Sequence, residues 1–97
     1  MVAYAIAQIS VHDPETYKKY AQAVPATLEQ YGGKFRVRGG AVTPVEGGWS
    51  PERVVVLEFA DMAAVKRWYD SPEYQKIIGN RLKASDGKVI FVEGFEG

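Results

Sequence analysis

The sequence contains no cysteine and a single histidine, His12. Without cysteine the chain cannot form a disulfide, a thiolate nucleophile or a cysteine-based metal site. One histidine with no close set of carboxylates leaves no ligand cluster for a transition metal. The glycine-rich patterns GxGxxG and GxxxxGK[ST], which bind nucleotide phosphates, are also missing. We therefore expect no metal site and no cofactor.

Excess charge and long apolar runs are missing as well. Twelve basic side chains balance twelve acidic ones, and no lysine and arginine cluster marks a nucleic-acid surface. The first apolar stretch is about half of the ~20 residues that span a bilayer as a helix. It also has neither the basic region nor the cleavage site of a signal peptide. We expect a cytoplasmic protein, with no nucleic-acid partner and no membrane segment, that folds as one domain over residues 1–97.

Apolar residues at period two predict four strands. The continuous run Val54–Leu57 is typical of a strand covered on both faces, which favours a central position. Gly39-Gly40 interrupts one of the runs and indicates a bulge or a close backbone approach. The predicted strands are Val2–Val11, Lys34–Val45, Arg53–Phe59 and Lys88–Phe95. The segments Glu46–Glu52 and Ala84–Gly87 are predicted to be turns or loops.

Three residues are predicted to cap helices. Asp13, Asp61 and Ser71 each precede a stripe of apolar residues spaced three and four apart. The first helix should end at Gly32-Gly33 with a left-handed cap, and Pro25 inside it removes one backbone hydrogen bond. On the last helix the predicted buried side is Tyr74, Ile77, Ile78 and Leu82.

The predicted order β-α-β-β-α-β defines an α+β domain of the ferredoxin-like type. Right-handed crossovers place the first and third strands at the centre of a four-stranded antiparallel sheet, with the helices on one face. Because both sets of alternating residues are largely apolar, the second face is predicted to pack against another copy of the chain. A two-fold homodimer is the commonest such solution.

Three stretches resemble a known family. They are the run Gly33–Gly40, the stretch Val55–Tyr74 with its SPEY sequence, and the tail Val89–Gly94 with its VEG sequence. Together with Arg81, they resemble the domain-of-unknown-function 1330 family. The resemblance implies a dimeric α+β barrel of two ferredoxin-like subunits. It also implies kinship with cofactor-independent monooxygenases, haem-degrading enzymes, muconolactone isomerase and stress-responsive proteins, but no particular activity.

Two residues are candidates for catalysis, each with a structural alternative. His12 is a candidate general base, because a histidine side chain can transfer protons near neutrality, or it is a surface turn residue. Arg38 precedes two glycines and could clamp a carboxylate or an enolate, or it pairs with Glu58 or Glu93 across the sheet.

Six residues are candidates for ligand binding. Each has another role to weigh: Ser71 as a helix cap, Trp68 as core, and the tyrosines as ordinary aromatic packing. The six are Tyr17, Arg38, Gly39, Trp68, Ser71 and Tyr74.

Two functions are compatible with these features. The first is a small-molecule-binding protein, or a cofactor-independent enzyme, that acts on a small acidic or aromatic metabolite. The alternative is a non-catalytic homodimeric module with a structural or stress-response role. The polar residues near glycines favour the first, and the two-sided apolar sheet is what the second requires.

Overall fold

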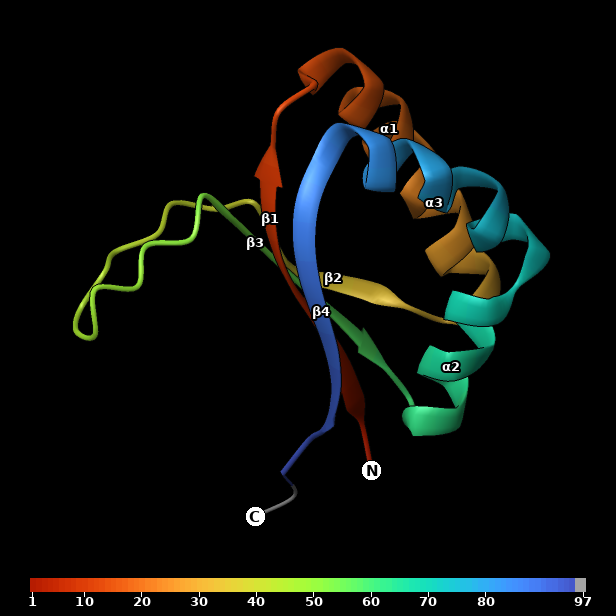
Figure 1. Cartoon of the computed structure of the whole chain (residues 1–97). Helices are drawn as coiled ribbons and strands as arrows, with labels where there is room; N and C mark the ends of the chain where they lie inside the picture. Colours follow the sequence, from red (N-terminus) through yellow and green to blue (C-terminus); the bar gives the residue numbers. More distant parts are fainter. Residues whose placement is uncertain (96–97) are drawn as a thin grey trace.

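The computed structural model describes residues 1–95. One four-stranded sheet is covered on one face by helices (Figure 1). The elements are β1 (Ala3–Val11), α1 (Pro14–Tyr31), β2 (Lys34–Arg38), β3 (Arg53–Phe59), α2 (Met62–Asp70), α3 (Pro72–Ala84) and β4 (Ser85–Glu93).

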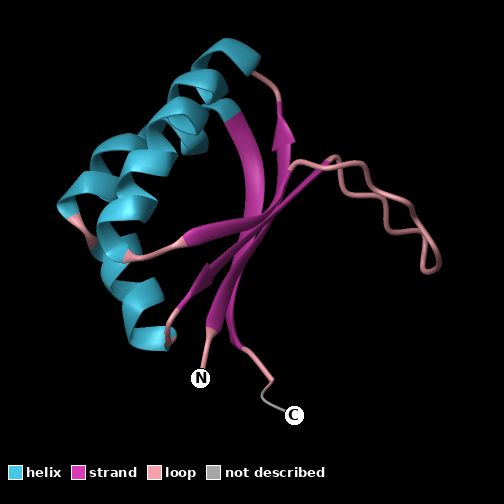
Figure 2. Cartoon of the chain, turned by 180° about the vertical axis from the view of Figure 1, so that it is seen from behind, coloured by secondary structure: helices cyan, strands magenta, loops and turns pink. Residues whose placement is uncertain are grey.

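The strand order is β2-β3-β1-β4, and every pairing is antiparallel. β1 and β3 are therefore central, as the sequence predicts, and the fold is ferredoxin-like. Figure 2 shows all of the helices on the same side of the sheet. None of the helices in the described part of the chain has the length and apolarity needed to cross a bilayer.

The predicted caps are confirmed. The side chains of Asp13, Asp61 and Ser71 accept hydrogen bonds from the backbone N–H groups of Thr16, Ala64 and Tyr74. The first helix ends at Gly32, whose φ of 76° is left-handed, so a residue without a side chain suits this position. Ser71 ends α2 and begins α3, which makes the second crossover two short helices.

Alternation along the strands separates the two sheet faces. Ala3, Ala5 and Ile9 of β1 and Leu57 and Phe59 of β3 are buried beneath the helices. The opposite face is formed by Tyr4, Ile6, Val37, Val54, Val56, Ile90 and Val92, which we call the outer face. Its residues range from half-buried to exposed, and Ile90 is 59% exposed. The chain therefore has a filled core on one side of the sheet and an open apolar surface on the other.

Two of the predicted strands have the wrong bounds. β2 ends at Arg38, and residues 39–52 form a long excursion, which we call the arm, in place of a strand reaching Val45. The arm projects on the side of the sheet away from the helices (Figures 1 and 2). β4 begins at Ser85 and ends at Glu93, so Ala84–Gly87 is not a turn, and Phe95 lies beyond the sheet and is 93% exposed.

Candidate functional site

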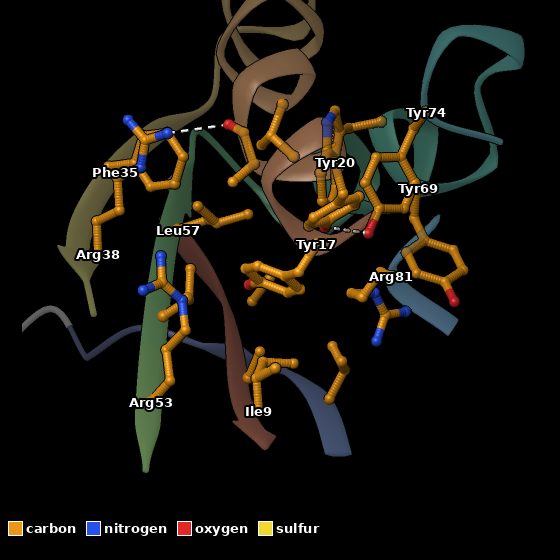
Figure 3. Close-up of a pocket in the computed structure, with 17 residues that line it drawn as sticks. Ile9, Tyr17, Tyr20, Phe35, Arg38, Arg53, Leu57, Tyr69, Tyr74 and Arg81 are labelled. Atoms are coloured by element: carbon orange, nitrogen blue, oxygen red, sulfur yellow. Dashed lines mark hydrogen bonds between the residues drawn. The ribbon is translucent and has the colours of Figure 1, made fainter. Parts of the chain in front are cut away.

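A cavity of about 50 Å³ lies between the sheet and the helices. Every strand and helix contributes to its lining (Figure 3). The lining residues are Ala5, Ala7, Ile9, Tyr17, Tyr20, Ala21, Val24, Phe35, Arg38, Arg53, Val55, Leu57, Trp68, Tyr69, Tyr74, Arg81 and Val89. Small alanines on β1 leave the space that the larger side chains of the helices surround.

One wall of the cavity is a cluster of aromatic rings. The rings of Trp68 and Tyr74 have centroids 4.1 Å apart, and those of Tyr69 and Tyr74 are separated by 5.4 Å. The indole N–H of Trp68 donates to the hydroxyl of Thr27 at 3.0 Å, which fixes the ring. The wall is therefore rigid and apolar, as small-molecule sites commonly are.

Two buried tyrosine hydroxyls are polar groups of this wall. The hydroxyls of Tyr20 and Tyr74 share a hydrogen bond of 2.7 Å, and the two rings meet edge to face. Burial raises the pKa of Tyr20 far above its ordinary value, and the neighbouring Tyr74 adds to the effect. Burial likewise raises the pKa of Tyr74. Both phenols are therefore neutral and can donate a hydrogen bond.

The charged groups that line the cavity are all arginines. Arg38 comes from β2, Arg53 from β3 and Arg81 from α3, and the lining includes no aspartate or glutamate. Arg81 is only 7% exposed, whereas Arg38 is exposed. Figure 3 shows Arg53 and Arg81 on opposite sides of Tyr17. The site therefore has a positive potential that no acidic lining residue offsets.

Gly39 makes room for one of these arginines. Its φ is +67°, and a Cβ at this position would collide with the guanidinium of Arg53. The Arg53 guanidinium lies over the ring of Tyr17, 5.5 Å from its centroid. Gly39 thus acts on the cavity through Arg53, since it is not itself a lining residue.

Arg38 links the edge strand to α1 at the rim of the cavity. One of its terminal nitrogens donates to the backbone carbonyl of Ala21 at 3.0 Å, and its guanidinium lies 4.4 Å from the ring centroid of Phe35. Pro25 has no N–H, so the Ala21 carbonyl is without its usual helical partner. Glu58, one of the two partners suggested for Arg38, forms its ion pair with Arg36 instead, with 3.1 Å between nitrogen and oxygen.

The structure brings four of the predicted site residues together. Tyr17, Arg38, Trp68 and Tyr74 all line the cavity. Gly39, Ser71 and His12 are not lining residues. Ser71 is buried at the junction of α2 and α3, where its hydroxyl donates to the Trp68 carbonyl at 2.7 Å. His12 is exposed in the turn between β1 and α1.

The buried arginine, Arg81, is not among the site residues predicted from the sequence. Leu82, predicted to be buried on α3, is 63% exposed, and Arg81 occupies the buried position beside it. The signal was present, because Arg81 follows Tyr74 and Ile78 at helical spacing on the same face. A charged residue within an apolar stripe marks either a paired charge or a site.

The chain belongs to the family described as domain of unknown function DUF1330, whose model matches residues 2–95. No curated protein matches the sequence. A protein of unknown function from Rhodopseudomonas palustris, RPA0582, has a similar structure, with a TM-score of 0.76 at 16% identity over 99% of this chain and 84% of that one.

Two further solved structures share the fold. A dimeric ferredoxin-like protein of unknown function from Jannaschia sp. CCS1 has a TM-score of 0.67 at 15% identity, over 97% of this chain and 100% of that one. SnoaB, a cofactor-independent oxygenase from Streptomyces nogalater, has a TM-score of 0.62 at 12% identity, over 99% and 94%. At these identities the likeness is one of fold.

Proposed function

We propose that the protein binds a small acidic or aromatic molecule in the cavity between its sheet and its helices. The supporting observation is the lining itself, which combines aromatic walls with three arginines and no acidic side chain. Aromatic and aliphatic walls contribute affinity through burial, and a few fixed polar groups give orientation. The Tyr20 and Tyr74 hydroxyls and the arginines would serve as those polar groups.

The same proposal includes a homodimer formed through the outer face. The sheet is four strands wide with about seven paired residues along its centre, which corresponds to a footprint of roughly 450 Å². A stable interface buries about 800 Å² per partner. The arm projects on the same side and exposes Val42, Val45 and Trp49, so it would supply much of the remainder. The dimeric Jannaschia protein of the same fold is consistent with this arrangement.

A thermal-shift screen tests ligand binding. The panel contains aromatic acids, aliphatic dicarboxylic acids and neutral aromatic compounds. We expect the melting temperature to rise, because a ligand at about 100 times its Kd stabilises the folded state by about 2.7 kcal/mol. Ala7→Leu should abolish the shift because it fills the lining, while Ala63→Leu on the exposed face of α2 should retain it. A panel without any shift, or a shift that survives A7L unchanged, contradicts the proposal.

Cofactor-independent oxygenation of the bound molecule is a second candidate. A buried guanidinium would favour the anionic form of a substrate, which is the electron-rich form that oxidation requires, and SnoaB shows that the fold can host such chemistry. Oxygen uptake with each ligand from the screen tests it, and ligands that bind without uptake contradict it.

A stable dimer that binds no ligand would instead favour the non-catalytic module.

A further inference from the structure

Arg81 is a buried cation without an acidic partner. It projects from α3, is 7% exposed and lines the cavity. The salt bridge found among residues 1–95 joins Arg36 to Glu58 on the other side of the sheet. The Nε–H group of Arg81 is buried and has no hydrogen-bond partner in the described part of the chain. A buried guanidinium with an unused donor is unfavourable unless something else compensates its charge.

The neighbouring groups of Arg81 do not provide that charge. The groups close to it are the phenol hydroxyls of Tyr74, Tyr20 and Tyr69. Burial works to lower the pKa of Arg81, but the pKa is raised overall. The guanidinium remains charged, because arginine is not deprotonated in proteins. Burial also raises the pKa of Tyr20 and of Tyr74, so neither is a phenolate.

A second arginine of the lining also has a buried hydrogen-bond donor without a partner within residues 1–95. The Nε–H of Arg53 is also buried without a hydrogen-bond partner among the described residues. Its guanidinium is held over the Tyr17 ring, in the space that Gly39 leaves open. Two arginines from different elements thus line one cavity, on either side of Tyr17, and each has a buried Nε–H without a partner among the described residues (Figure 3).

We infer that the ligand is an organic anion whose charged oxygen binds the guanidinium of Arg81. This assignment rests on the proposed binding function and names the charge class and the binding group. A carboxylate or a phenolate on an aromatic ring has the required chemistry, since its oxygen can accept hydrogen bonds from the guanidinium and from the Tyr74 hydroxyl while the ring packs against the aromatic wall. Charge-assisted hydrogen bonds of this kind are the strong ones. Arg53 provides a second positive group for a ligand that is acidic at both ends.

Matched ligand pairs test the charge requirement by isothermal titration calorimetry. Benzoate and benzamide have similar shapes and differ in charge, and 4-nitrophenolate with nitrobenzene repeats the comparison for a phenolate. We expect the anion of at least one pair to bind wild-type protein about ten- to hundred-fold more tightly than its neutral partner. Which pair shows the preference distinguishes the carboxylate from the phenolate.

Substitutions of Arg81 test whether its positive charge is responsible for the anion preference. Arg81→Met keeps an unbranched apolar stem and removes the cation, so the anion preference should disappear, while Arg81→Lys should retain part of it. Arg67→Gln, an exposed change on α2, should alter nothing. Unliganded R81M should melt no lower than wild type, because an unpartnered buried charge is removed.

Two results would overturn the assignment. Equal binding of charged and neutral partners would show that the site does not select anions, although the proposed binding function would stand. The second result combines two observations: unliganded R81M loses much of its stability, and the anion preference persists in R81K and in the R81M that still folds. Together they would show that Arg81 is structural. If neither these four compounds nor the wider panel binds, the proposed function fails as well.

Discussion

Gly33 illustrates how tightly the base of the core is packed. A Cβ built at this position would lie 2.6 Å from the Phe59 ring and 2.9 Å from the Leu28 side chain. Both neighbours are almost completely buried. Because neither can move into solvent, the chain needs a residue without a side chain where α1 leads into β2.

Gly33→Ala should therefore destabilise the protein by about 1–3 kcal/mol, the usual range for overpacking a core. Urea denaturation followed by circular dichroism measures the change. Gly79→Ala is the matched control, since Gly79 is exposed within α3 and its Cβ would meet no atom within 4 Å. G79A should stabilise the protein by about 0.5–1 kcal/mol. Equal effects of the two substitutions would contradict this account of Gly33.

At the scale of elements, Arg38 and Pro25 form a link between β2 and α1. The proline leaves the Ala21 carbonyl without an N–H donor from its own helix, and the Arg38 guanidinium supplies one at 3.0 Å. This bond fastens the edge strand of the sheet to the helix at the rim of the cavity. Arg38 of β2 thus donates to the one carbonyl of α1 that Pro25 leaves without a helical partner.

A double-mutant cycle tests this coupling. Arg38→Met should cost about 0.5–1.5 kcal/mol of unfolding free energy in the wild-type background, the usual net value of one hydrogen bond. In the Pro25→Ala background the cost should fall, because the restored N–H then serves the Ala21 carbonyl. The free energies come from urea denaturation of the four proteins. Identical costs in both backgrounds would show that Arg38 acts independently of Pro25.

The elements that could be predicted are those whose signals are local. Asp13, Asp61 and Ser71 each cap a helix because a short polar side chain can satisfy free N–H groups, and the sequence alone shows such a residue before an apolar stripe. The strand order then follows from the handedness of the crossovers. These features depend little on distant parts of the chain.

The errors occur where a residue's role depends on tertiary contacts. Gly87 suggests a turn, but it lies within β4, where a Cβ would meet the Ile9 side chain at 2.8 Å. The apolar residues that follow Arg38 suggest a strand, but within the described residues they have no strand partner, and they continue into the arm. Arg81 shares the helical spacing of Tyr74 and Ile78, but the spacing alone does not show whether a charged side chain in such a stripe is buried, and its burial depends on packing against other elements.

For the whole molecule, the decisive feature is the contrast between the two sheet faces. One is covered by three helices, and the other displays apolar side chains from all four strands. A homodimer through the outer face would cover these side chains. The arm, whose Trp49 donates to the Gln8 side chain at 2.7 Å and is still 65% exposed, lies beside that surface and would contact the partner.

Ile90→Asp tests the dimer because it places a charge among the apolar side chains of the outer face. Ile90 is opposite Ile6 on the neighbouring strand, so the new carboxylate would replace an apolar side chain that faces another one. We expect wild-type protein to have the mass of a dimer at micromolar concentration in light scattering, and I90D the mass of a monomer, since burying a charge in an apolar interface is unfavourable.

Leu82→Asp is the control that separates loss of assembly from loss of fold. Leu82 is as exposed as Ile90, but it lies on α3, on the helical side of the sheet. L82D should therefore remain a dimer, and both variants should keep the circular dichroism of the wild type. A monomeric wild-type protein would contradict the dimer outright, because the apolar outer face would then be stable in water. If I90D remained a dimer, the chains would associate through another surface, and the outer face would require a different explanation.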